Sequence, residues 1–253
     1  MNQKIALITG ATAGIGYETA LILAQNNYNL ILTGRREERL DAIKQQIESD
    51  FGCEVLTLNF DIRKRTETEE ALNSIPEKWR AIDVLINNAG LAAGLAPVNS
   101  ADVDDWETMI DTNVKGLLYA SRIITPWMIE RQTGHIINIS SIAGKEAYPN
   151  GSVYCGTKHA VEAISKAMRI ELLPFGIKVT TIAPGAVETE FSLVRFRGDK
   201  DRADQVYKGF TPLSGKDIAE TILFVVSRPA HVNIDNLLIM PTAQASARDF
   251  NRK

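Results

Sequence analysis

The sequence has few cysteines and histidines, and it has no long apolar run. Its two cysteines, Cys53 and Cys155, fall in no metal-ligand spacing, and its three histidines are scattered. We therefore expect no disulfide framework and no metal site, and reduced thiols favour a cytoplasmic protein. No apolar run approaches the roughly 20 residues of a membrane-spanning helix. The first residues lead directly into a strand-like run, which leaves no room for a signal peptide.

An excess of basic residues is also absent. The 253 residues carry a formal net charge of −3, and the isoelectric point is about 5.7. A broad basic surface for nucleic acid is therefore not expected. The composition that is present, 45% hydrophobic and 23% charged, is that of an ordinary globular protein with a sizeable core.

Short aliphatic segments alternate with longer amphipathic segments along nearly the whole chain. Continuous apolar runs such as Ala6-Leu7-Ile8 are typical of strands that are buried on both faces. The alternation predicts an α/β fold, a Rossmann-like doubly wound parallel sheet with helices on both faces. Strands are expected at 4–9, 30–33, 54–59, 83–87, 135–140, 178–183 and 237–240, and helices at 14–25, 37–49, 104–131 and 152–173.

No linker or internal repeat interrupts this pattern, so we expect a single domain that spans residues 1–253. Residues 189–212 break the alternation, because they mix aromatic side chains with arginines and lysines. An insertion between a late strand and a helix is where a lid would lie, and a solvated surface loop is the alternative. A C-terminal tail, residues 241–253, follows the last predicted strand.

A glycine-rich segment, Thr9-Gly-Ala-Thr-Ala-Gly-Ile-Gly16, joins the first predicted strand to the first predicted helix. Glycine lets the backbone turn tightly and approach a pyrophosphate, while the N-terminus of the helix supplies amide donors. The spacing differs from the GxGxxG fingerprint. The prediction of dinucleotide binding therefore depends on the position of this loop between strand and helix.

The end of the second predicted strand indicates which dinucleotide is bound. An acidic residue there would bind the ribose 2′-hydroxyl of NAD, but this chain has Gly34-Arg35-Arg36. Guanidinium groups bind a 2′-phosphate through charge-assisted hydrogen bonds. The sequence therefore predicts NADP(H), held by Arg35 and Arg36. For Arg36, a surface pairing with Glu37 or Glu38 is the alternative.

Tyr154 and Lys158 stand four residues apart in a predicted helix, and Ser141 lies thirteen residues before the tyrosine. Residues i and i+4 share a helix face, so the phenol and the ammonium would point to the same place. A free tyrosine has a pKa of about 10, and a cation beside it would lower that value. The three residues suggest a general acid tuned by a lysine, with Ser141 holding a substrate oxygen. A chance spacing is the alternative.

These motifs occur in order with Asn87-Asn-Ala-Gly90, Asn113 and Pro184-Gly185, and over nearly its whole length the chain resembles the classical short-chain dehydrogenases/reductases. The resemblance implies about seven parallel strands, usually a homotetramer, and hydride transfer between a nicotinamide and a carbonyl carbon. The helices at 104–131 and 152–173 would then join the subunits.

The resemblance also implies roles for individual residues. Tyr154 would protonate the carbonyl oxygen, Ser141 would orient it, Lys158 would lower the phenol's pKa and hold the nicotinamide ribose, and Asn113 would anchor a proton-relay water. Asn113 as a buried structural amide, Ser140 in place of Ser141, and Asp61 as a helix N-cap remain alternatives. The expected cofactor contacts are Gly10, Thr12, Ala13, Gly14, Ile15, Gly16, Arg35, Arg36, Asp61, Ile62, Asn87, Ala89, Gly90, Tyr154, Lys158, Pro184, Gly185, Val187 and Thr189.

Segments 105–113, 194–199 and 229–234 are similar to those of the NADP-dependent 3-hydroxy acid (serine/allo-threonine) dehydrogenases. That group includes reductases of malonic semialdehyde and sulfoacetaldehyde, and its members close over a short acid. A buried anion needs a cation beside it, and Arg195 in the lid is the first candidate, with an exposed arginine as the alternative. The expected substrate contacts are Ser141, Tyr148, Tyr154, Arg195, Gln244 and Arg248.

Arg248 departs from the tail of that group, and a second guanidinium suits a three-oxygen sulfonate better than a planar carboxylate. The specific hypothesis is therefore NADPH-dependent reduction of sulfoacetaldehyde to isethionate, a step of taurine-derived sulfonate metabolism. The alternative is an NADP-dependent 3-hydroxy acid or serine dehydrogenase, or a malonic semialdehyde reductase. Two other classes stay open, a non-enzymatic NADPH-binding sensor and a ketoacyl reductase that acts on a carrier protein.

Overall fold

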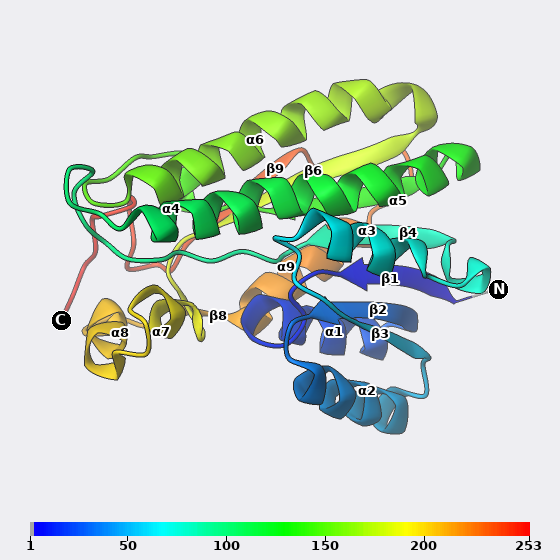
Figure 1. Cartoon of the computed structure of the whole chain (residues 1–253), viewed down its shortest axis with the longest axis horizontal. Coiled ribbons are helices and arrows are strands. Elements are labelled where there is room, and N and C mark those ends of the chain that lie inside the picture. Colours follow the sequence, from blue (N-terminus) through cyan, green and yellow to red (C-terminus); the bar gives the residue numbers. More distant parts are fainter. Residues whose placement is uncertain (1–2) are drawn as a thin grey trace.

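The computed structural model describes residues 3–253; Met1 and Asn2, which the sequence assigns to the same domain, lie outside the described residues. Seven parallel strands form one sheet in the order β3-β2-β1-β4-β5-β6-β9 (Figure 1). From β1 the chain adds β2 and β3 on one side, and it then returns to add β4, β5, β6 and β9 on the other side. The predicted doubly wound parallel sheet is therefore confirmed. The strands are β1 Lys4–Ile8, β2 Tyr28–Gly34, β3 Val55–Asn59, β4 Ile82–Asn87, β5 Gly134–Ile139, β6 Ile177–Pro184 and β9 Asn236–Ile239.

Alternate side chains of each central strand enter two different apolar cores. In β1, Ile5 and Leu7 pack on one face of the sheet, and Ala6 and Ile8 pack on the other. Because both faces are apolar, the strand reads as an uninterrupted hydrophobic run. Helices α1 (Gly14–Gln25), α2 (Glu37–Phe51) and α9 (Gly215–Val226) cover one face, and α3 (Arg65–Asn73), α5 (Leu117–Arg131) and α6 (Ser152–Leu172) cover the other (Figure 1).

The helix predicted at 104–131 is interrupted in its middle. It consists of α4 (Val103–Ile110), a π-helical segment at Asp111–Gly116, and α5. Such segments insert an extra residue into a helical turn and are frequent at functional sites. This one carries Asn113, so the tertiary position of that side chain is set by an irregularity that the periodicity did not reveal.

Residues 189–212 contain two short helices, α7 (Phe191–Arg195) and α8 (Lys200–Tyr207), which pack against each other. A small parallel pair, β7 (Val187–Glu188) with β8 (Leu213–Ser214), joins the two ends of this segment. Figure 1 shows α7 and α8 beyond the end of the sheet at which the strands finish. The segment is thus anchored at its base beside the site expected for a ligand.

No helix between residues 3 and 253 has both the length and the apolar character to cross a membrane. In the same range, no group of three or more His, Cys, Asp or Glu side chains is arranged to hold a metal ion.

Candidate functional site

A cavity of about 650 Å³ opens where the sheet strands end. Its lining runs from Arg35 and Asp61, beyond β2 and β3, to Tyr154 and Lys158 on α6. The order of the sheet reverses between β1 and β4, and ligands of doubly wound sheets bind in the crevice at this reversal. The cavity therefore occupies the place where the sequence predicted a dinucleotide.

The glycine loop between β1 and α1 packs so tightly that side chains would not fit at two of its positions. A Cβ on Gly16 would collide with the carbonyl oxygen of Gly10, and a Cβ on Gly10 would lie 2.9 Å from the Cα of Ala89. Gly10 also has a φ of +67°, which favours glycine. Gly16 is thus used for helix–strand packing and does not line the cavity, while Gly10, Gly14 and Ile15 do. This cradle fits a pyrophosphate at the N-terminus of α1.

Most of the expected cofactor contacts line this one cavity. They are Gly10, Thr12, Ala13, Gly14, Ile15, Arg35, Arg36, Asp61, Ile62, Ala89, Gly90, Tyr154, Lys158, Pro184, Gly185, Val187 and Thr189. Because these residues come from every third of the chain, their convergence is a property of the folded sheet edge and supports one extended ligand.

Asp61 does not cap a helix, because α3 begins at Arg65 and has Lys64 at its N-cap position. Its carboxylate accepts hydrogen bonds from the backbone and guanidinium of Arg63, at 3.1 and 2.9 Å. Burial alone would raise the pKa of Asp61, but the bonds from Arg63 lower it overall. Asp61 is thus an ionised acceptor at the edge of the cavity.

Asn87 does not face the cavity. Its amide donates to Ser121 at 3.0 Å and to Asn138 at 2.9 Å, inside the fold. Successive strand residues point to opposite sides, so the next residue, Asn88, is the one that turns toward the glycine loop. Asn88 donates to the backbone oxygens of Thr9 and Gly10, at 2.9 and 3.1 Å. Asn88 lines the cavity and Asn87 does not, so the side-chain contact predicted at Asn87 would fall to its neighbour.

Asn113 is buried and does not line the cavity either. Its amide oxygen accepts from the Leu91 backbone at 2.8 Å, and its amide nitrogen donates to the Leu91 carbonyl at 2.8 Å and to the Thr157 hydroxyl at 3.0 Å. Both amide protons are thus engaged by the protein. The geometry agrees with the alternative of a structural amide, which holds Leu91 against α6.

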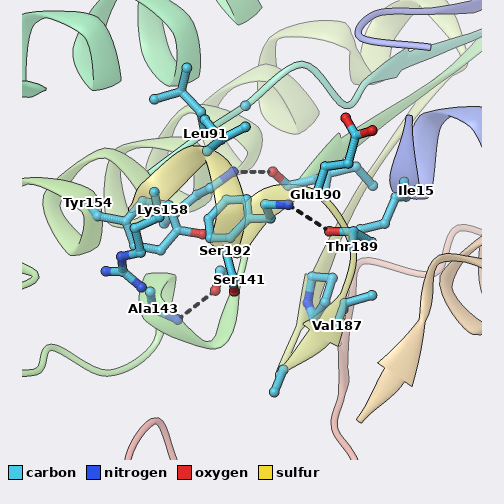
Figure 2. Close-up of a pocket in the computed structure, with 18 of the residues that line it drawn as sticks. Ile15, Leu91, Ser141, Ala143, Tyr154, Lys158, Val187, Thr189, Glu190 and Ser192 are labelled. Carbon is cyan, nitrogen blue, oxygen red and sulfur yellow. Dashed lines mark hydrogen bonds between the residues drawn. The ribbon is translucent and has the colours of Figure 1, made fainter. Parts of the chain in front are cut away.

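Figure 2 shows Tyr154, Lys158 and Ser141 on one side of the cavity and Ile15, Thr189 and Glu190 on the other. The Lys158 ammonium donates to the carbonyl oxygen of Ile139 at 2.9 Å. Burial lowers the pKa of Lys158 to about 8, and the nearby Glu162 opposes this shift. The lysine therefore titrates much closer to neutrality than an exposed lysine does.

Burial raises the pKa of Tyr154 above its ordinary value, and the Tyr148 phenol raises it further. The Ser141 hydroxyl and the Arg195 guanidinium act in the opposite direction but do not overcome burial. The lowered phenol pKa expected from the Tyr-Lys spacing is thus wrong for the residues described. The reason is that desolvation disfavours the phenolate more than the neighbouring groups stabilise it.

Ser141 and Ser140 both line the cavity but differ in their surroundings. Ser141 accepts a hydrogen bond from the Ala143 backbone at 3.1 Å. A hydrogen bond between Ser141 and the Tyr154 phenol acts to lower the pKa of the phenol. The Ser140 hydroxyl is buried and has no partner among residues 3–253. The geometry therefore favours Ser141 as the partner of Tyr154.

The lid brings Arg195 next to the two tyrosines. Its guanidinium donates to the Tyr148 hydroxyl at 3.0 Å and to the Gly94 carbonyl at 3.3 Å. It also lies 5.5 Å from the centre of the Tyr154 ring. A cation therefore stands beside the Tyr154 phenol at one end of the cavity.

The tail contributes Gln244 and Arg248 to the cavity lining. The Gln244 amide oxygen accepts from the Ala186 backbone at 2.8 Å, and its nitrogen donates to the Ser246 carbonyl at 3.0 Å. Gln244 therefore fastens the tail to the segment that follows Pro184. Arg248 is exposed at the rim.

Glu190, a charged residue of the cavity lining, was missed in the sequence. Glu190 pairs with Arg36 and with Arg39, in each case at 2.8 Å. The surface pairing of Arg36 with Glu37 or Glu38 is thus not what the structure shows. Glu190 lies 154 positions from Arg36, so no local signal could have revealed the contact.

The sequence matches a family model described as short chain dehydrogenase over residues 4–198. The NADP-dependent 3-hydroxy acid dehydrogenase YdfG of Salmonella typhi is 49% identical over 244 residues, which cover 96% of this chain and 97% of that protein. The protein of the same name from Escherichia coli K12 is 46% identical over the same shares. The NADP-dependent 3-hydroxy acid dehydrogenase of Schizosaccharomyces pombe is 42% identical and covers 100% of this chain and 98% of its own length.

Solved structures give the same picture. The closed form of serine dehydrogenase complexed with NADP+ superimposes with a TM-score of 0.91 at 45% identity, covering 98% of this chain and all of that one. Serine dehydrogenase from Escherichia coli superimposes with a TM-score of 0.81 at 41% identity, covering 95% and 99%.

Proposed function

Because the chain belongs to the short-chain dehydrogenase family, we propose that it is an NADP(H)-dependent oxidoreductase whose substrate is a short 3-hydroxy acid, oxidised at the hydroxyl carbon. The observation that carries the proposal is the position of Arg195, a cation beside the Tyr154 phenol at one end of a dinucleotide-sized cavity. Relatives of 42–49% identity are named as dehydrogenases of this type.

The adenosine end of the cofactor is assigned to the end of β2. Arg35 and Arg36 supply positive charge there. Strand β2 itself contains no Asp or Glu whose carboxylate would repel a 2′-phosphate. The catalytic end is assigned to Thr189, Lys158 and Tyr154. When bound there, the nicotinamide would accept the hydride from the hydroxyl carbon or return it.

Tyr154 would move the proton on the reacting oxygen, and Ser141 would hold that oxygen. Lys158 would balance the charge on the phenol, since its ammonium is buried on the same face of α6. Arg195 would bind the acid group, and Tyr148 would orient the guanidinium through their hydrogen bond. Asn113 would act indirectly, through the Leu91 backbone that it holds.

The substrate's acid group divides two candidates. The names of the relatives favour a carboxylate. A sulfonate, with reduction of sulfoacetaldehyde to isethionate, is supported by one feature, the second guanidinium of Arg248 at the rim of the same cavity. Since the relatives' names carry more weight than one exposed side chain, the hydroxy acid is our main proposal.

The test is a comparison of kcat/KM for malonic semialdehyde and sulfoacetaldehyde with NADPH, and for serine and 3-hydroxypropanoate with NADP+. We expect the carboxylates to be preferred by at least about tenfold, and Arg248→Ala to leave them nearly unchanged. A tenfold preference for the sulfonate would select the second candidate. Turnover of carrier-protein thioesters alone would indicate a ketoacyl reductase, and nucleotide binding without turnover would indicate a sensor.

The assembly proposed for this enzyme is a cytoplasmic homotetramer. Exposed apolar side chains lie along α4, α5 and α6, at Val103, Ile110, Leu118 and Ile170. These four positions are where we propose that subunits meet; contiguous apolar patches mark such contacts, whereas single exposed apolar side chains are common on any surface. Light scattering coupled to size-exclusion chromatography measures the number of subunits directly.

A further inference from the structure

Glu190 links the cofactor end of the cavity to the lid. It follows Thr189, lines the cavity, and immediately precedes α7. One oxygen of its carboxylate lies 2.8 Å from Arg36 and the other lies 2.8 Å from Arg39. Figure 2 shows this carboxylate directed away from Tyr154 and Lys158. Glu190 is therefore placed for an effect on the adenosine end of the cofactor and not on the chemical step.

The two neighbouring arginines at the end of β2 differ in their engagement. Arg36 uses Nε and Nη2 to reach the Thr12 hydroxyl, at 3.1 and 2.8 Å, and Nη1 to reach Glu190. Arg35 lines the same cavity and forms no ion pair with the described part of the chain. A phosphate in this place therefore meets one guanidinium that is available and one that already holds a carboxylate.

We infer that Glu190 determines how tightly the enzyme binds the 2′-phosphate of its cofactor, by competing with that phosphate for Arg36. A carboxylate and a phosphate are alternative anionic partners of one guanidinium. Arg39 keeps the second oxygen of Glu190 when Arg36 is released, so the start of the lid remains attached. The bonds from Arg36 and Arg39 lower the pKa of Glu190, which keeps it ionised at neutral pH. This inference rests on the proposed use of NADP(H).

The size of the effect follows from the exposure of the pair. The side chains of Arg36 and Glu190 are 43% and 42% exposed, and ion pairs of this kind are weak. Removing the competing carboxylate should therefore tighten binding of a 2′-phosphate by about two- to fivefold. A nucleotide without this phosphate does not need Arg36, so its binding should stay within about twofold.

The experiment is isothermal titration calorimetry of the full-length protein with adenosine 2′,5′-bisphosphate and with adenosine 5′-monophosphate, at fixed ionic strength. Glu190→Gln should lower the Kd for the bisphosphate and leave that for the monophosphate unchanged. Glu188→Gln is the matched control, because Glu188 is exposed in β7, two residues away, and does not line the cavity. It should change neither Kd.

A double-mutant comparison shows whether the effect passes through Arg36. In an Arg36→Met background, Glu190→Gln should no longer tighten the bisphosphate. An equal gain in that background, an equal gain for both nucleotides, or weaker binding in Glu190→Gln alone would each overturn the inference. A wild-type protein that binds the two nucleotides equally would instead refute the cofactor assignment, and a failure on hydroxy acids would leave the nucleotide result untouched.

Discussion

The two walls of the cavity are held in place by different interactions. On the sheet side, Tyr154 and Lys158 are 7% and 5% exposed, and the loop before α1 packs against the segment that follows β4, at Ala89. On the lid side, Arg197 is 64% exposed and pairs with Asp102 and Asp105 across a surface. Burial fixes the first wall, whereas exposed ion pairs contribute to holding the second.

This difference separates chemistry from recognition. The residues proposed to move the proton belong to the buried wall, where a misplaced atom is costly to accommodate. The residues proposed to bind the acid group and to close the cavity belong to the wall with weaker contacts, which can open at little cost. Substitutions on the two walls should therefore have effects of different size and different kind.

The largest effect is expected from Tyr154→Phe on the buried wall. The substitution removes the hydroxyl and keeps the ring, so packing against Phe191, whose centre lies 5.7 Å away, is retained. Loss of a general acid or base lowers kcat by about a hundred- to ten-thousandfold. Steady-state assays with NADPH measure kcat, and nucleotide binding serves as the control. Undiminished turnover would contradict the proposed role.

Lys158→Met tests the cost of a buried cation on the same wall. The pKa of Lys158 falls from 10.5 to about 8 in the folded protein. Between these values the unfolded chain holds more protons, so the free energy of unfolding should rise with pH, by about 2–4 kcal/mol in total. The methionine variant should be more stable than wild type at pH 7 and should lack this rise, while losing activity. Urea unfolding at pH 7 and pH 9.5 measures the free energy of unfolding of wild type and of the variant. An equal change with pH in both proteins would contradict the predicted cost of the buried ammonium.

Arg195→Ala tests recognition on the lid wall. Charge-assisted hydrogen bonds contribute about 1.5–3 kcal/mol, so KM for an anionic substrate should rise about ten- to a hundredfold. A neutral aldehyde of similar size should be affected little. Arg202→Ala is the control, because this lid arginine stacks on Phe196 at 4.4 Å and does not line the cavity. Equal losses for charged and neutral substrates would indicate a collapsed lid instead.

The smallest effect is expected from Arg197→Ala, which breaks both surface pairs of the lid with Asp102 and Asp105. Exposed pairs are screened by salt. We expect kcat/KM to change by less than about twofold at low ionic strength and not at all in 1 M salt. A large change that persists in salt would mean that the lid wall depends on Arg197 for more than charge.

Much of the site could be predicted because its motifs are local. The spacing of Tyr154 and Lys158 and the position of the glycine loop each describe a single turn or junction. What the motifs did not specify is the direction in which each side chain points. Asn87 faces inward where Asn88 faces the loop, and the amide of Asn113 is taken up by Leu91 and Thr157. A motif specifies which residues are adjacent in the chain but not which side chain of an adjacent pair reaches the cavity.

The sequence by itself determined the parallel sheet and the placement of Tyr154 and Lys158 on one face of α6. Both follow from strand and helix periods, which act over a few residues. Only the tertiary structure decided the pKa of Tyr154, the partner of Arg36 and the contact of Arg195 with Tyr148. Each of these depends on burial or on groups that are far apart in the chain, such as Glu190 and Arg36. Desolvation and long-range charge pairing exist only once the layers have packed, so no local pattern encodes them.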